Sequence, residues 1–166
     1  MKSIAGFTFA ALASVAMAGG GARCASGPSL QLGAIPIGAS PTDFSGFRSN
    51  DCEGQEPPLS DCSAEGTDGL RYGFFDGGLT RVVAETGVAD PHVRLPGGIK
   101  FGQDIDAAAA ELERSGLRFD RGRDGEGRVV HSTDFVVTSA AGVNYSLELV
   151  ADVEGRLAKV IERTDF

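Results

Sequence analysis

Apolar residues along this chain gather in short runs that are separated by turn-forming residues. The runs at 70–75 and 79–86 flank Asp76-Gly77-Gly78, and an Asp-Gly turn between two apolar runs is a strong signal for a β-hairpin. Further strands are predicted at 128–132, 135–138, 143–151 and 156–163, the last two joined by a turn at 152–155. The pattern therefore predicts antiparallel strands in both halves of the chain.

Two segments carry the signals of helices. Ser40-Pro41-Thr42-Asp43 combines a capping hydroxyl, a proline suited to the first helical position and an acidic residue three places on. The helix that begins there is predicted to be short and to end by Phe47. A second helix is predicted from the capping residue Asp104 to Gly116. Its apolar stripe, which predicts packing against a core, comprises Ile105, Ala108, Ala109 and Leu112.

The two halves of the chain follow the same plan. Pro36-Ile37-Gly38-Ala39-Ser40 leads into the first helix, and Lys100-Phe101-Gly102-Gln103-Asp104 leads into the second. Each half then closes on a hairpin with the same apolar spacing after its turn, so that Leu79, Val82 and Val83 match Leu157, Val160 and Ile161. The sequence therefore predicts an α+β fold of two tandem helix-plus-antiparallel-sheet units, one at 30–90 and one at 91–166.

This arrangement resembles the beta-lactamase-inhibitor-protein-like (BLIP-like) fold. The resemblance lies in an aliphatic-x-Gly step into a capped helix, followed by a hairpin with an Asp-Gly-type turn and a Leu-x-x-Val strand. It covers most of residues 34–163, and each unit is similar to small outer-membrane-assembly lipoproteins. The resemblance implies two units that stand side by side, in an exported protein that binds other proteins without catalysing a reaction.

The first residues carry the signals of export. Residues 1–18 have one positive charge at Lys2, an apolar run, and Ala16 and Ala18 at the positions that signal peptidase reads. We therefore predict a cleavable signal peptide at 1–18 and a flexible linker at 19–29. The apolar run is shorter than the roughly 20 residues that a membrane-spanning helix needs, so no transmembrane span is predicted. The expected location is periplasmic or secreted.

Cys24, just after the predicted cleavage site, raises the alternative of a lipid-anchored protein. A lipid-modified cysteine normally follows a small residue, and Arg23 stands in that place here, which disfavours a lipid anchor at Cys24. An odd cysteine in a linker is expected to be either a free thiol or one half of an intermolecular disulfide. The sequence leaves these two alternatives open.

Cys52 and Cys62 bracket a polar, proline-rich loop. Because an exported protein can keep such a pair oxidised, we predict a disulfide between them. Metal binding is the rival interpretation, but the pair has neither C-x-x-C spacing nor a nearby histidine.

The charge of the chain narrows the class of partner. The formal net charge is -8, and no cluster of lysines and arginines offsets it along the sequence. Such a balance repels the phosphates of nucleic acids and of anionic lipid head groups. Nucleic acid is therefore not expected as a partner.

Few residues suit catalysis or metal binding. His92 and His131 are the two possible proton shuttles at neutral pH, and each is interpreted as an ordinary surface or partly packed histidine. A secreted enzyme that uses His131 with a nearby carboxylate is the rival hypothesis. Asp120 to Gly127 resembles a calcium loop but has Gly122 where an oxygen ligand is required, so a solvated turn is favoured. No catalytic residue, metal or cofactor is predicted, and a small-ligand or calcium-binding domain remains an alternative.

Surface recognition is the function that the sequence favours. Tyr72, Phe74 and Phe75 alternate between the two faces of one predicted strand, so one face bears an aromatic side chain that is either exposed or packed in a core. An exposed Phe75 would mark a contact surface. We therefore expect an exported, non-enzymatic module that binds another exported or envelope protein.

We expect intact-mass analysis of the exported protein under non-reducing conditions to give residues 19–166, less the hydrogens lost in forming one disulfide. Both cleavage after Ala18 and oxidation of Cys52 and Cys62 follow from the sequence pattern. The same sample after reduction is the control. A mass that retains residues 1–18, or that includes a lipid at Cys24, would contradict the expectation.

Overall fold

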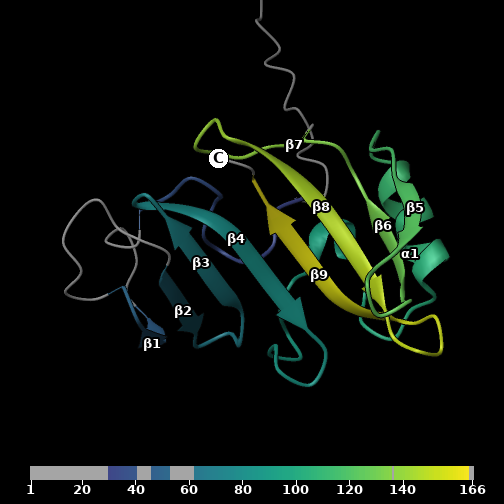
Figure 1. The fold of residues 1–166 in the computed structure, drawn as a ribbon, viewed down its shortest axis with the longest axis horizontal. Helices are drawn as coiled ribbons and strands as arrows, with labels where there is room; N and C mark the ends of the chain where they lie inside the picture. The colour runs from purple at the N-terminus through teal and green to yellow at the C-terminus, as the bar shows by residue number, and fades with distance from the viewer. Residues whose placement is uncertain (1–29, 41–45, 53–61, 136, 165–166) are drawn as a thin grey trace, which may run out of the picture.

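The computed structural model describes residues 30–40, 46–52, 62–135 and 137–164. Its strands are β1 (Phe47–Asn50), β2 (Cys62–Gly66), β3 (Arg71–Phe75), β4 (Gly78–Glu85), β5 (Asp120–Arg123), β6 (Val129–Ser132), β7 (Val137–Thr138), β8 (Asn144–Ala151) and β9 (Leu157–Arg163). Together they form one antiparallel sheet in the order β1-β2-β3-β4-β9-β8-β6-β5, with β7 paired to β8 (Figure 1).

The prediction of two helix-plus-sheet units is wrong. Strand β4 from the first half pairs with β9 from the second, with Val83 opposite Ile161, so both halves share one sheet. The described residues contain a single α-helix, α1 (Ile105–Glu113), and one 3-10 turn, η2 (Pro96–Gly98). A strand left at the edge of a separate unit would expose unpaired backbone groups, and pairing β4 with β9 satisfies them. None of the helices in the described ranges is long and apolar enough to cross a membrane.

The first predicted helix falls mainly at residues 41–45, which lie outside the described residues. Phe47, where that helix was expected to end, instead begins strand β1. The Phe47 ring packs edge-on against Tyr72 and Phe74, with ring centroids 5.7 and 6.2 Å apart. These contacts with β3 favour an extended backbone at Phe47. The capping pattern at 40–43 could not indicate them, because it depends only on residues that are close in sequence.

The predicted β3–β4 hairpin and the second predicted helix are confirmed. Asp76 and Gly77 have positive φ angles of 48° and 78°, as the favoured two-residue hairpin turn requires. The Asp104 side chain accepts a hydrogen bond from the Ala107 amide at 2.9 Å and so caps α1. The apolar stripe predicted for this helix is buried in the main core.

The main core lies on one face of the sheet. Three segments cover this face: residues 30–39, the connector between β4 and α1 (residues 86–104, which include η2), and α1. They bury Leu32, Leu95 and Leu112 against the sheet. In Figure 1 these covering segments lie mostly behind the strands. No helix of the described chain covers the opposite face, whose own buried cluster is limited to Val83, Val150 and Ile161. We call this second face the open face.

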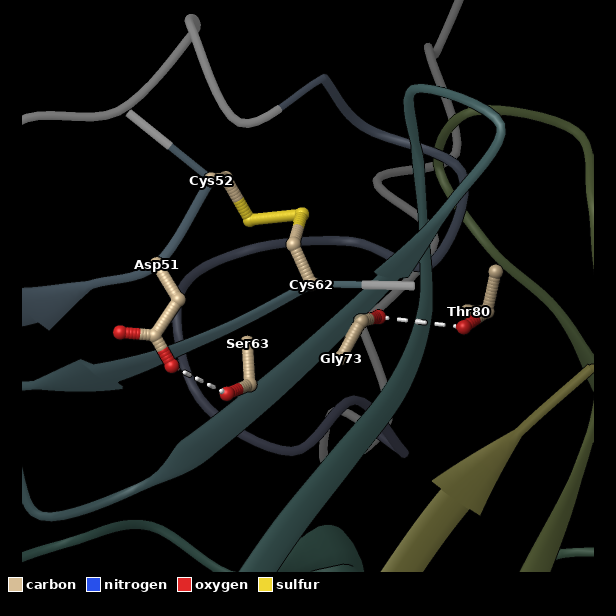
Figure 2. Close-up of a disulfide and its surroundings, with 6 residues drawn as sticks. All are labelled: Asp51, Cys52, Cys62, Ser63, Gly73 and Thr80. Atoms are coloured by element: carbon tan, nitrogen blue, oxygen red, sulfur yellow. Dashed lines mark hydrogen bonds between the residues drawn. A yellow bond between two sulfur atoms is a disulfide. The ribbon is translucent and has the colours of Figure 1, made fainter. Parts of the chain in front are cut away.

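The predicted disulfide is present, with the Cα atoms of Cys52 and Cys62 5.1 Å apart (Figure 2). Cys52 follows β1 and Cys62 begins β2, so the bridge ties the outermost strand to its neighbour. Beside it, the Ser63 hydroxyl donates a hydrogen bond to the Asp51 carboxylate at 3.2 Å. The bridge therefore stabilises the β1 edge of the sheet.

We expect replacement of both Cys52 and Cys62 by serine to lower the free energy of unfolding by roughly 2.5 to 3 kcal/mol, because the unfolded chain regains the entropy of a loop of about ten residues. Urea unfolding under non-reducing conditions measures this loss. Cys24→Ser is the matched control and should leave the midpoint unchanged. Equal stability of the double variant and the wild type would contradict the expectation.

Candidate binding surface

The open face is organised in rows that run across the strands. Residues directly opposite each other in an antiparallel sheet point to the same face, so the pairing register assigns each row. The first row, which we call the arginine row, runs from β2 to β8 and comprises Ser63, Gly73, Arg81, Arg163 and Ser146. Two arginines therefore stand next to each other at its centre, on β4 and β9.

Beside the arginine row lies an apolar seam. Val83, Ile161 and Val150 have exposed fractions of only 6%, 7% and 3%, although no helix of the described chain covers this face. The seam is flanked by long charged side chains, whose aliphatic stems can cover apolar neighbours. The seam is therefore packed beneath these charged side chains, and the accessible part of the open face at this point is charged.

The carboxylates around the seam are held by cations. Glu85 lies 2.7 Å from Arg71 and 3.3 Å from Lys159, the residues on its two flanks. Glu148 lies 3.5 Å from Arg163. These groups are partly exposed, so each pair contributes little to stability. Their effect is to fix the direction of the charged side chains on the open face.

The structure separates the three aromatic residues that the sequence singled out. Tyr72 and Phe74 are buried, with exposed fractions of 3% and 2%, and belong to the main core. Phe75 points to the other face and is 45% exposed. Tyr72 and Phe74 therefore offer no surface to a partner, whereas Phe75 adds an apolar side chain to the open face near the arginine row.

A buried carboxyl that the sequence analysis missed lies on the covered side of β9. Glu162 is 0% exposed, and its Oε1 accepts a hydrogen bond from the Leu32 amide. Its Oε2 has no hydrogen-bond partner among the described residues. Burial raises the pKa of Glu162 to about 8, although the Leu32 amide acts in the opposite direction. The side chain therefore anchors segment 30–39 to the sheet and is mainly protonated at neutral pH.

Two tyrosines share this part of the core. Burial raises the pKa of both Tyr72 and Tyr145, and the nearby Glu162 carboxylate adds to each shift. The Tyr72 hydroxyl donates to the Asp68 carboxylate at 2.9 Å. The signal for Glu162 was present in the sequence, because alternation along the last strand places it on the same face as Val160.

Neither histidine lies on the open face. His92 is exposed in the connector. His131 lies on the covered face, with its Nε2 2.6 Å from Asp106 Oδ1, and Arg121 also contacts Asp106 at 3.1 Å. Hydrogen bonds from His131 and Arg121 lower the pKa of Asp106. The contact between His131 and Asp106 joins β6 to α1.

The Asp120 to Gly127 turn uses its central carboxylate internally. Asp124 accepts hydrogen bonds from the Glu126 amide at 3.0 Å, from the Arg128 amide at 2.9 Å and from Arg128 Nε at 2.7 Å. These bonds close the turn between β5 and β6. Within the described ranges, no group of three or more histidine, cysteine or acidic residues is placed to hold a metal ion.

Two hollows lie in the connector rather than on the open face. Their volumes are about 610 and 430 Å³, and both are lined by Pro91, Val93, Leu95, Ile99 and Lys100. The lining is mainly apolar, with Lys100 as a shared cation. Asp90 also lines the larger hollow, and Arg94 lines the smaller one.

These features define an antiparallel-sheet protein with one covered face and one open face. Comparisons of the chain with protein families, with curated proteins and with solved structures found no match.

We expect Glu162→Gln to become more stable relative to the wild type as the pH rises from 4.5 to about 8. In this window ionisation of Glu162 stabilises the unfolded wild type, while the folded state keeps the group protonated. The free energy of unfolding of the wild type therefore falls by about 1.4 kcal/mol per pH unit, and that of the variant does not. Above pH 8 the difference levels off.

Urea unfolding at several pH values measures this difference. Glu113→Gln, at an exposed position of α1, is the control for the loss of one negative charge. A stability difference between Glu162→Gln and the wild type that does not change with pH would contradict the expectation.

Proposed function

We propose that this protein is an exported, non-enzymatic module that binds another exported or envelope protein through the open face of its sheet. The observation that carries the proposal is the composition of that face. Phe75, which is exposed, and the paired charges above the buried apolar seam lie together on a broad surface that no helix of the described chain covers. A face with an exposed aromatic side chain and directed charge suits contact with another protein surface better than it suits a small ligand.

Export is supported by the chemistry of the cysteines. Disulfides persist in oxidising compartments, and Cys52 and Cys62 form one. The export pattern of residues 1–18 agrees with this compartment. The partner is therefore sought among proteins of the envelope or the medium.

We expect Phe75→Asp to weaken binding of the partner at least about tenfold, since it places a charge in the apolar part of the contact. The full mature chain captures proteins from an envelope extract, and each captured protein is then purified and its affinity measured directly. Circular dichroism and thermal unfolding verify that the variant is folded.

Val153→Asp is the matched control, because Val153 is 97% exposed in the turn between β8 and β9. It makes the same kind of change away from the open face and should leave the affinity unaltered. The proposal is wrong if no purified protein binds the wild type, or if Phe75→Asp and Val153→Asp bind equally well.

A further inference from the structure

The centre of the open face holds two arginines that repel each other. Arg81 of β4 lies directly opposite Arg163 of β9, and like charges at directly opposite positions destabilise a sheet. Arg163 has one carboxylate neighbour, Glu148 at 3.5 Å. Arg81 is exposed and forms no ion pair within the described part of the chain. The folded protein therefore keeps a repulsion in its sheet that a bound anion would relieve.

The flanks of this pair are small. Gly73 lies opposite Arg81 on β3, where an added Cβ would come within 3.4 Å of the Arg81 Cβ. Ser63 follows on β2, and its hydroxyl is already bonded to Asp51. On the other flank, Ser146 donates to the Arg163 carbonyl at 3.3 Å. Small residues with occupied hydroxyls leave the two guanidinium groups as the polar groups that an incoming chain would meet.

The charge around the pair has the opposite sign to the whole protein. On the four central strands β3, β4, β9 and β8 the open face carries Arg71, Arg81, Lys159 and Arg163 against the carboxylates Glu85 and Glu148. Two further carboxylates of this face, Glu65 and Asp120, lie on the outer strands β2 and β5. The chain as a whole has a formal net charge of -8. A membrane or nucleic acid meets the field of the whole molecule and is repelled, whereas a short segment meets the local basic patch.

We infer that the open face binds an acidic segment of the partner protein, whose carboxylates pair with Arg81 and Arg163. Guanidinium groups pair with carboxylates through two parallel hydrogen bonds, which gives direction as well as attraction. Phe75 lies two residues along β3 from Gly73 and on the same face, so it is placed to contact an apolar residue of that segment. This inference rests on the proposed function and adds the chemistry of the partner.

The test uses the isotopically labelled full mature chain and two peptides of the same length, one rich in glutamate and one with glutamine in its place. Nuclear magnetic resonance titration at low salt measures affinity and locates the contact. We expect the glutamate peptide to bind, to shift the signals of β3, β4 and β9, and to lose affinity as salt is added. The glutamine peptide should bind at least about tenfold more weakly.

The variant that tests the site is Arg81→Glu with Arg163→Gln, and it should reduce the affinity for the glutamate peptide at least about tenfold. It also removes the repulsion between the opposed arginines, so it is expected to remain folded, and the milder Arg81→Gln gives a second readout. Arg94→Glu with Arg114→Gln is the control matched in charge, since Arg94 is exposed in the connector and Arg114 is exposed at the end of α1. Equal affinities of the two double variants would overturn the inference.

Two further outcomes distinguish the inference from the proposed function. If inorganic phosphate or vesicles of phosphatidylglycerol compete as well as the glutamate peptide at equal charge, the row is a general anion site and the inference is overturned. If Phe75→Asp weakens binding of a purified partner but Arg81→Glu with Arg163→Gln leaves its affinity unchanged, the proposed function stands and the inference is overturned. Loss of partner and peptide together in that variant supports both.

Discussion

The pairing of β4 with β9 is the contact on which the rest of the structure depends. It joins strands about eighty residues apart in sequence and merges two hairpins into one sheet. Because the two strands form the middle of that sheet, their side chains supply both the main core and the centre of the open face. Without this pairing, the core would split and the opposed arginines would never meet.

The covered face of the sheet holds the main core, and the open face holds the arginine pair. On the covered face, segment 30–39, the connector and α1 exclude water, and the buried Glu162 ties the first of these to the sheet through the Leu32 amide. A buried carboxyl and a repulsive arginine pair both cost stability. Glu162 has a structural role that offsets part of its cost. In the arginine pair only Arg163 has a carboxylate partner among the described residues, Glu148 at 3.5 Å, and such incompletely compensated features tend to mark functional surfaces.

Local signals predicted the local structure well. The Asp76–Gly77 turn, the Asp104 cap and the stripe of α1 depend on residues within one or two turns of each other, so the sequence carries them. The disulfide was predictable for the same reason, since Cys52 and Cys62 are close in the chain. Strand β1 was not, because Phe47 is held by aromatic contacts with β3 that only the folded sheet creates.

The sequence alone determined the hairpins, the capped helix, the disulfide loop, the acidic balance and the aromatic residues of β3. It could not determine that the two halves form one sheet, because strand pairing over a long separation depends on which edges meet after each hairpin has formed. Only the tertiary structure decided which aromatic is exposed, with Phe75 on the open face and Tyr72 and Phe74 in the core. The same holds for Arg81 and Arg163, since register across β4 and β9 places them together and no pattern within either strand does.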